Sequence, residues 1–377
     1  MTRSHFPEAD WRMSVPRIVL DAMGGDYAPA AAVTGAAQAI RELGVELVLV
    51  GPQDVVNAEV SRQRLTATLS DSAFRVVDAP EVIGMAEHPV TAVRAKRRSS
   101  IVVGLDLVAR GEADAFVTAG NTGATMAAAV LGLRRLEGVE RPALATMFPT
   151  RTDACLLLDV GANADARPEH LVHFAVMGSA YAERVLGRKD PSVALLSIGE
   201  EETKGSLLVQ EAHQQLQQAP IRFVGNVEGK DIPAGAADVV VTDGFVGNVL
   251  IKFAEGLGSS ILQIIREEIR SNLWSTLLGA GLRPSFSRVR RRMDYSEWGG
   301  APLLGVAGVC IIGHGRSNPR AIRNAIRAAK QAVEQDLIAH IQSGVTSLEM
   351  ATSRTAPAAS GESVPARAAL DQPASES

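Results

Sequence analysis

The chain has 377 residues, of which 46% are hydrophobic and only 4% aromatic, and its formal net charge is -4. This length allows one large α/β domain or two smaller ones, and the aliphatic composition favours buried strands covered by helices over an aromatic-rich sandwich. The negative balance excludes a protein that attracts nucleic acid through its overall charge, so we expect no nucleic-acid partner.

The two ends of the chain differ in composition from the middle. Residues 1–16 are polar and lack the apolar core of a signal peptide, and 351–377 are rich in Ala, Ser, Pro and Thr without periodicity. We expect both to be disordered, with one catalytic α/β domain over 17–350. No apolar run reaches the length needed to span a bilayer, so we expect a soluble chain.

Short apolar runs alternate with stretches of helical spacing through this domain. Such alternation predicts βαβ units and an α/β fold with a mainly parallel sheet flanked by helices. We see no internal repeat. The predicted strands are Arg17–Asp21, Val45–Val50, Arg75–Val77, Ala115–Thr118, Cys155–Asp159, Ser192–Ser197, Arg222–Asn226, Val239–Thr242 and Val309–Ile312.

Both cysteines of the chain, Cys155 and Cys310, lie in apolar runs of strand type. We expect inert buried thiols at both positions. Two isolated cysteines do not make a secreted disulfide scaffold, so a cytoplasmic protein is expected.

One segment, 253–295, departs from the alternation and contains no predicted strand. Leu257, Ile261 and Ile265 share one helical face, and the following residues combine an apolar, Trp-bearing tip with an arginine-rich flank. This pattern predicts a protruding helical hairpin that contacts a membrane surface or an acidic carrier, or else a solvated hairpin associated with a dimer. The expected contact residues are Leu273, Trp274, Leu278, Arg288 and Arg291.

Several predicted strands end in clusters of glycine and small polar residues. In a parallel sheet such ends gather at one edge, where glycine lets the backbone approach a ligand and helix starts favour anions. One such loop is explained by a tight turn alone, but six together predict a phosphate-handling cleft. The loops are 21–26, 118–123, 158–163, 197–205, 242–248 and 313–315.

Named nucleotide and nucleophile motifs are missing from the sequence. There is no Gly-x-Gly-x-x-Gly, no Walker-type phosphate loop and no Gly-x-Ser-x-Gly elbow. His170 and His173 are spaced to share a metal, but no third ligand follows at a telling spacing, so a solvated first helical turn is expected instead. His314, between glycines at a strand end, is a candidate titrating group or a structural residue. We therefore expect phosphate binding without Walker-type ATP chemistry, and no metal.

Longer strings occur in a fixed order along the chain. From about Arg17 to Gln342 they resemble the bacterial phosphate acyltransferases of phospholipid synthesis. The strings include Asp21-Ala-Met-Gly-Gly-Asp26, Ala119-Gly-Asn-Thr-Gly-Ala124, Arg141-Pro-Ala-Leu144, Leu158-Asp-Val-Gly-Ala-Asn163, Met177-Gly-Ser179, the segment from Leu195 to Gly205, Val241-Thr-Asp-Gly-Phe-Val-Gly-Asn248 and His314-Gly315.

The resemblance implies a fold like that of isocitrate dehydrogenases and phosphotransacetylases, and a homodimer. It implies an acyltransferase (class EC 2.3.1) that converts acyl-[acyl carrier protein] and inorganic phosphate to acyl phosphate and free carrier. A membrane glycerol-3-phosphate acyltransferase then uses the product. The family associates loosely with the membrane through the hairpin, so a cytoplasmic, peripherally membrane-associated enzyme is implied.

A thioester is already activated, so the implied reaction depends on positioning phosphate and on donors facing the developing oxyanion. Asn248 is the candidate oxyanion donor, and Asp243, Asp26 and His314 are candidates for orienting phosphate or handling its proton. The aspartates have a plain alternative as helix caps, and the asparagines as partners of loop backbone. The candidate catalytic residues are Lys204, Asp243, Asn248, His314 and Arg94, and the candidate phosphate-binding or substrate-binding residues are Asp21, Gly24, Gly25, Asp26, Ser99, Ser100, Asn121, Thr122, Gly123, Asp159 and Asn163.

Three other functions fit parts of the sequence. They are a short-chain phosphotransacetylase that uses coenzyme A, a non-catalytic phosphate-binding scaffold, and a nicotinamide dehydrogenase of the same broad fold. The apolar hairpin argues against the first. Turnover separates the second from an enzyme, and nucleotide binding identifies the third.

Overall fold

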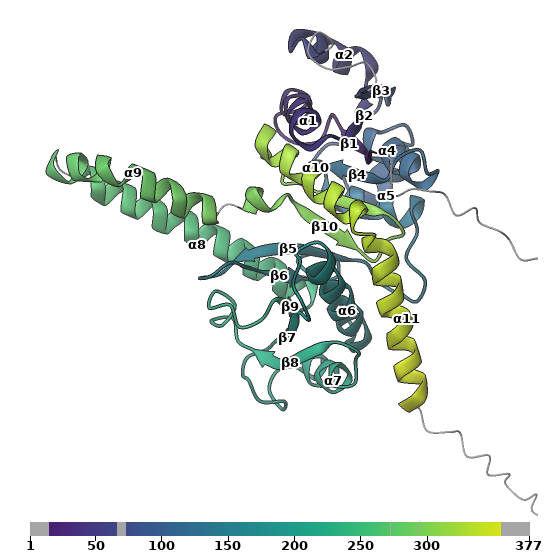
Figure 1. Ribbon diagram of the computed structural model, residues 1–377, viewed down its shortest axis with the longest axis vertical. Helices are drawn as coiled ribbons and strands as arrows, with labels where there is room; N and C mark the ends of the chain where they lie inside the picture. Colours follow the sequence, from purple (N-terminus) through teal and green to yellow (C-terminus); the bar gives the residue numbers. More distant parts are fainter. Residues whose placement is uncertain (1–14, 66–72, 272, 294, 356–377) are drawn as a thin grey trace, which may run out of the picture.

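The computed structural model describes residues 15–65, 73–271, 273–293 and 295–355, and these build one eleven-stranded sheet with helices on both faces (Figure 1). The strand order is β3-β2-β1-β4-β11-β10-β5-β6-β9-β7-β8. All nine predicted strands form, which confirms the α/β class. The strands are β1 (Arg17–Asp21), β2 (Glu46–Gly51), β3 (Phe74–Asp78), β4 (Ala115–Thr118), β5 (Ala143–Pro149), β6 (Ala154–Leu158), β7 (Ser192–Leu196), β8 (Arg222–Val227), β9 (Val239–Val241), β10 (Ala301–Leu304) and β11 (Val309–Ile312).

The helices cover the two faces of the sheet with separate apolar clusters. Neighbouring residues of β1 alternate between the faces: Ile18 and Leu20 belong to one cluster and Val19 to the other. Helices α1, α2, α6, α7, α10 and α11 supply the first cluster, and α3, α4, α5 and the start of α8 supply the second. The helices are α1 (Ala30–Leu43), α2 (Gln53–Arg62), α3 (Pro89–Ala95), α4 (Ser100–Ala109), α5 (Thr122–Gly132), α6 (Pro168–Arg184), α7 (Leu207–Leu216), α8 (Gly244–Arg270), α9 (Leu273–Met293), the 3₁₀ turn η3 (Tyr295–Trp298), α10 (Pro319–Glu334) and α11 (Leu337–Thr355).

Two strands, β5 and β10, interrupt the parallel order at the centre of the sheet. β10 is antiparallel to both β11 and β5, and β5 is antiparallel to β6. The sequence did not predict either strand, because Pro302 stands inside β10 and Pro149 ends β5, and proline argues against a central strand. The sheet therefore consists of two parallel halves that run in opposite directions and meet at the antiparallel strands β10 and β5.

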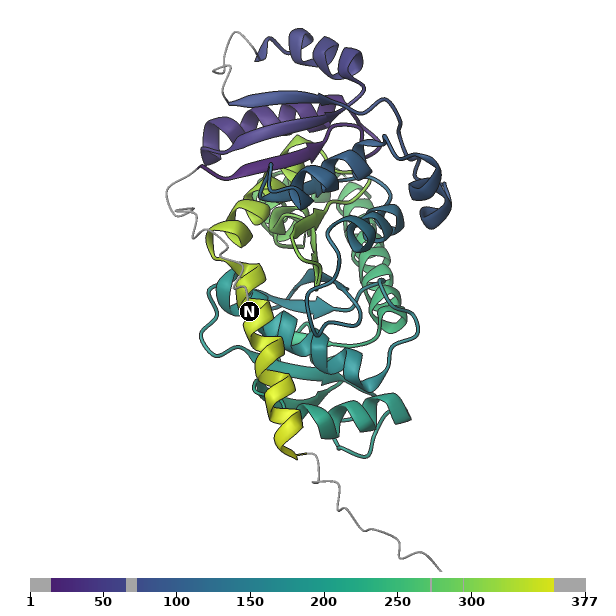
Figure 2. The same ribbon diagram turned by 90° about the vertical axis from the view of Figure 1, so that its right-hand side faces the viewer.

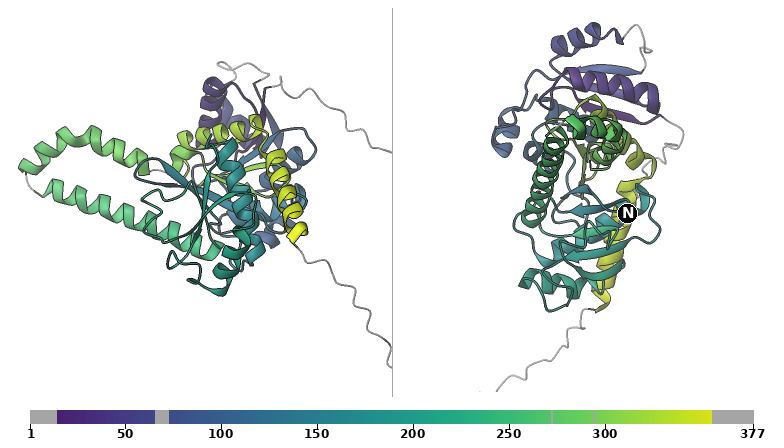
Figure 3. Two further views of the ribbon diagram at one scale, coloured as in Figure 1. Left: turned by 60° about the horizontal axis from the view of Figure 1, so that its bottom comes forward. Right: turned by 90° about the vertical axis from the view of Figure 1, so that its left-hand side faces the viewer.

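Helices α8 and α9 pack against each other and project from the body of the protein, which confirms the predicted hairpin (Figures 1 and 3). α8 is longer than expected, because it begins at Gly244. By length and composition α8 is also apolar enough to cross a membrane, contrary to the expectation from sequence. Its first turn is nevertheless built into the protein, since Gly244 N donates to Asn163 O at 2.8 Å.

Helix α11 extends along one side of the molecule and packs against α6 (Figure 2). It continues to Thr355, so the tail expected from residue 351 begins inside a helix. The remainder of that tail, 356–377, and most of the N-terminal extension, 1–14, lie outside the described residues.

Candidate active site

Three of the predicted glycine loops meet where β1, β4 and β11 end. Asp26 N donates to Gly315 O at 2.7 Å, and Gly313 N donates to Thr118 O at 2.6 Å. A side chain on Gly25 would be strained, because its φ is +98°, and crowded, because a Cβ would lie 3.0 Å from Gly315 O. The prediction of one shared edge is confirmed for these three loops. It is wrong for the other three, which follow β6, β7 and β9, because that half of the sheet runs in the opposite direction.

Asp21 holds two of these loops together from inside the protein. Its carboxylate accepts hydrogen bonds from Thr118 Oγ1 at 2.7 Å and from Met23 N at 3.0 Å. Burial raises the pKa of Asp21 above its ordinary value, although hydrogen bonds that include one from Ser100 act in the opposite direction. Gly24 lies so close that a Cβ would approach Gly120 N to 2.7 Å. Asp21, Ser100 and Gly24 thus fix the position of loop 21–26 against loop 118–123.

In the other half of the sheet, the buried carboxylate of Asp159 holds the loop after β6 in place through hydrogen bonds. Its Oδ2 accepts hydrogen bonds from the amide and the side chain of Asn163, at 2.7 and 2.8 Å, and its Oδ1 accepts from Leu144 N at 3.1 Å and Ala162 N at 3.0 Å. Burial raises the pKa of this carboxyl. A side chain on Gly247 would collide with the Asp159 carbonyl, so the first turns of α8 pack directly on this loop.

Asn121 anchors the start of α5 and a neighbouring loop. Its Oδ1 accepts from Ala124 N at 2.9 Å, while its Nδ2 is placed 3.2 Å from each of three carbonyl oxygens in the loop 84–87. The side chain is therefore occupied by backbone. The first N–H groups of a helix have no partner inside the helix. At the N-terminus of α5, which is the positive end of its dipole, the N–H groups of Thr122 and Gly123 are therefore left for a partner outside the helix.

A groove of about 770 Å³ lies between α8, β5 and these loops, and it joins the two halves of the site. Its polar end contains Thr122 and His314 from one half and Gly161 and Asn248 from the other. Its remaining wall is mainly apolar. The aliphatic and aromatic lining residues are Leu144, Met147, Phe148, Pro149, Val160, Pro233, Ile251, Ala254, Leu257, Ile261, Trp298, Ala301 and Ile312.

Several predicted site residues lie away from this groove. Lys204 is exposed in the loop after β7, and Arg94 is exposed on α3; neither lines the groove. Asp243 caps α8, since its Oδ1 accepts from Phe245 N and Val246 N at 2.9 Å. Ser99 is fully buried before α4, and its hydroxyl has no hydrogen-bond partner among the described residues.

Two cations that the sequence reasoning did not select do line the groove, namely Arg151 and Lys252. Lys252 follows the inward-facing Ile251 on α8, and its ammonium lies 4.0 Å from Glu255. Arg151 stands in the turn between β5 and β6. A correct prediction of β5 would have drawn attention to it.

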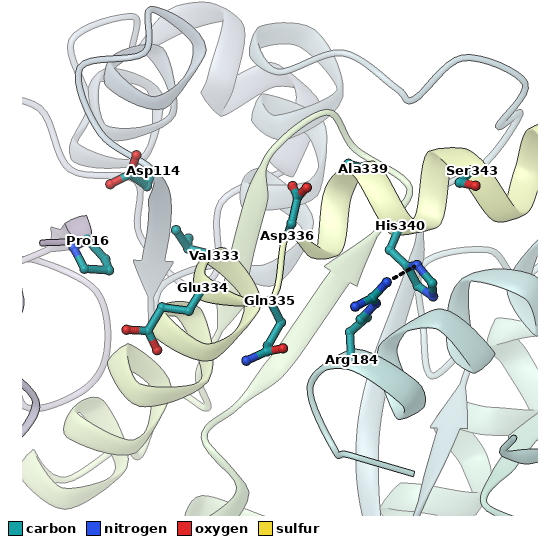
Figure 4. Close-up of a pocket in the computed structure, with 10 residues that line it drawn as sticks. All are labelled: Pro16, Asp114, Arg184, Val333, Glu334, Gln335, Asp336, Ala339, His340 and Ser343. Atoms are coloured by element: carbon teal, nitrogen blue, oxygen red, sulfur yellow. Dashed lines mark hydrogen bonds between the residues drawn. The ribbon is translucent and has the colours of Figure 1, made fainter. Parts of the chain in front are cut away.

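A second cavity, of about 810 Å³, opens at the opposite edge of the sheet (Figure 4). Pro16 and Asp114, which line it, directly precede β1 and β4, and Arg184 and His340 face each other across 3.2 Å. None of the predicted site residues lines this cavity. Ligands of open α/β sheets bind at the carboxyl ends of the strands, so the groove beside α8 is the candidate active site.

The other singled-out residues are structural. His170 is buried and not solvated as expected, because its Nδ1 accepts from Arg167 N at 3.0 Å in a capping box and its Nε2 lies 3.2 Å from Glu140. Burial raises the pKa of Cys155 and of Cys310 to about 12, which keeps both thiols protonated as predicted.

The family model for the fatty acid synthesis protein family matches residues 16–340. The chain belongs to this family. It is 51% identical over 327 residues to the phosphate acyltransferase of Desulfitobacterium hafniense, covering 86% of this chain and 96% of that protein. It is 52% identical to the phosphate acyltransferase of Nostoc punctiforme, covering 87% and 96%. These findings confirm the resemblance drawn from the glycine-rich strings.

Two solved structures share the fold of this chain, although their sequences are less similar to it than those of the relatives above. A phosphotransacetylase from Streptococcus pyogenes matches with a TM-score of 0.59 and 19% identity, covering 85% of this chain and 94% of that one. EutD phosphotransacetylase from Staphylococcus aureus matches with a TM-score of 0.58 at the same identity and coverage. The predicted phosphotransacetylase-like fold is confirmed.

Proposed function

We propose that this protein is a phosphate acyltransferase, which transfers an acyl group from acyl carrier protein to inorganic phosphate. The observation that carries the proposal is the groove itself. It joins a helix start suited to an anion with an apolar wall suited to a hydrocarbon chain. A long-chain acyl phosphate has these two parts.

Inorganic phosphate binds at the polar end. The amides of Thr122 and Gly123 at the start of α5, together with the Thr122 hydroxyl, donate to its oxygens, and the helix dipole favours its charge. Lys252 and Arg151 at the groove supply positive charge. Asp21, Asn121, Asp159 and Asn163 keep the loops in place, and Gly24 and Gly25 allow their close approach.

The reaction needs no cofactor. A phosphate oxygen attacks the thioester carbonyl, a C–O bond forms, and the C–S bond breaks as the carrier thiolate leaves. Asn248, which lines the groove beside Gly161, donates to the oxyanion from its amide nitrogen. His314 lies at the same polar end and protonates the leaving thiolate. Asp243 acts through the position of α8.

The hairpin of α8 and α9 binds other surfaces, namely a membrane and a second copy of the chain. Trp274 at its tip is 77% exposed, and Phe253 on α8, which does not line the groove, is 66% exposed. Large exposed apolar side chains in a row mark an interaction surface. We assign the tip and the arginines that follow, Arg288 among them, to an anionic membrane surface, and the Phe253 side of α8 to a second copy of the chain. The enzyme is then a cytoplasmic, peripherally membrane-associated homodimer whose product passes to a membrane glycerol-3-phosphate acyltransferase.

The test is to identify the product by mass spectrometry. Purified protein, palmitoyl-[acyl carrier protein] and phosphate should give palmitoyl phosphate and free carrier thiol in equal amounts. Omitting phosphate should abolish release of the thiol. Efficient turnover of acetyl-coenzyme A would favour a short-chain phosphotransacetylase instead, and carrier binding without turnover would favour a scaffold. A dehydrogenase would bind a nicotinamide nucleotide.

A further inference from the structure

One face of α8 forms a wall of the groove over several turns. Asn248, Ile251, Ala254, Gly258 and Ile261 all line it, at the spacing of three and four residues that places side chains on one side of a helix. Asn248 stands at the polar end, and the other four provide only hydrocarbon or no side chain. Lys252 and Glu255, which also line the groove, lie within two turns of Asn248, so the α8 wall carries its polar groups toward the reacting end and is apolar from Leu257 onward.

The opposite wall comes from β5. Leu144 and Phe148 point to the same side of the sheet as Ile251 and Ala254, since all four belong to or pack against the second apolar cluster. The side chains of Leu144 and Phe148 are each 8% exposed, so the packing around them holds them in fixed positions. A chain lying between β5 and α8 is thus held on both sides by apolar atoms.

The length of this wall can be compared with a substrate. Asn248 and Ile261 are thirteen residues apart on α8, which corresponds to about 20 Å along the helix axis. An extended long-chain acyl group is of this length, whereas a short one would fill only the part beside Ile251. Ala254 and Gly258 occupy the middle of the wall, where larger side chains would obstruct the groove.

We propose that Ala254 and Gly258 determine acyl chain length: their small size keeps the groove open for the distal part of an unbranched long acyl chain. The proposal rests on the proposed function and adds the position of the chain and the residues that limit it. The carbonyl lies beside Asn248, and the methyl end lies toward Ile261.

The experiment compares Ala254→Leu and Gly258→Leu with a matched control, Gly256→Leu. A Cβ on Gly256 meets nothing within 4 Å, so the control adds the same side chain to the same helix without entering the groove. Each protein is assayed with octanoyl-, lauroyl- and palmitoyl-[acyl carrier protein]. Both groove variants should lose about tenfold in kcat/KM for palmitoyl donor, the loss expected when about two methylene groups are no longer buried. Their octanoyl activity and the whole profile of Gly256→Leu should stay unchanged.

A binding measurement separates this inference from the proposed reaction. Cis-parinaric acid, a fluorescent long-chain fatty acid, should bind the wild type and Gly256→Leu but bind Ala254→Leu and Gly258→Leu at least about tenfold more weakly. If the groove variants keep the wild-type chain-length profile, or lose all chain lengths equally while binding the probe normally, the inference is overturned. If the wild type makes no acyl phosphate, the proposed function fails, whereas probe binding still decides where the chain lies.

Discussion

Asp159 Oδ1 accepts a hydrogen bond from Leu144 N at 3.1 Å, which fixes β5 to the loop that follows β6. Leu144 belongs to the apolar wall of the groove, and Gly161, in the loop, belongs to its polar end. One buried carboxylate thus sets the relative position of the two parts of the candidate site.

Asp159→Asn should destabilise the protein. The new amide group would place two donors among the amides that Asp159 now accepts from, and leaving such buried groups unsatisfied costs about 1–3 kcal/mol. Urea unfolding measures this loss. Asp165→Asn, at an exposed position nearby, is the control and should leave the unfolding midpoint unchanged. Equal midpoints for Asp159→Asn and the wild type would show that the network contributes nothing.

Asp21 should make stability depend on pH. Burial raises its pKa in the folded protein above the ordinary value of 3.8, so the folded state binds the proton more tightly than the unfolded state. Its contribution is fully present below pH 3.8 and is lost as pH rises through the raised folded pKa. The free energy of unfolding of the wild type minus that of Asp21→Asn should therefore fall with rising pH. Denaturant titrations across this range check the sign, and a difference that grows with pH would contradict it.

Asn248→Ala should slow the chemical step. A donor that faces the oxyanion contributes about 100-fold or more to kcat, while phosphate KM depends on other groups. Steady-state kinetics with saturating donor separate the two constants. Lys204→Ala, in the exposed loop after β7, is the comparison and should retain wild-type kcat and phosphate KM. A larger defect in Lys204→Ala than in Asn248→Ala would return Lys204 to the mechanism.

Replacing Leu273, Trp274 and Leu278 by serine should abolish sedimentation with anionic liposomes, because it removes the exposed Trp274 ring and two leucines from the apolar sequence of the tip. The side chains of Leu273 and Leu278 lie outside the part of the chain that the structure describes. Activity in solution should persist, since the groove lies at the base of the hairpin. Met350→Ser removes another exposed apolar side chain, on α11, and should not change sedimentation. Undiminished binding by the triple variant would remove the tip from membrane contact.

Much of the fold was predictable because its signals are local. The runs that form β1, β4 and β9 contain continuous apolar stretches buried from both faces, and glycine-rich turns mark where they end. The contacts among the loops after β1, β4 and β11 also followed, since these strands are parallel and bring their carboxyl ends to one edge. Individual motifs were enough for these inferences.

The groove was not predictable in the same way. Its wall depends on β5 and β10, whose prolines obscure the strand pattern, and on which face of α8 turns inward. Lys204 and Asn121 belong to glycine-rich strings as Asn248 does, yet only Asn248 lines the cavity. Whether a polar side chain serves the backbone or a ligand depends on neighbours that are distant in sequence.

The two antiparallel strands at the centre of the sheet, β5 and β10, have a consequence for the layer of helices that covers the sheet. Parallel neighbours require a crossover helix, but β5 joins β6 and β10 joins β11 through short turns, so neither of these two connections adds a helix to the layer. Two strand spacings, about 10 Å, are left for α8 and its ligand to cover. The hydrocarbon tail of the substrate then completes the hydrophobic interior, and occupancy of the groove should raise the melting temperature of the enzyme.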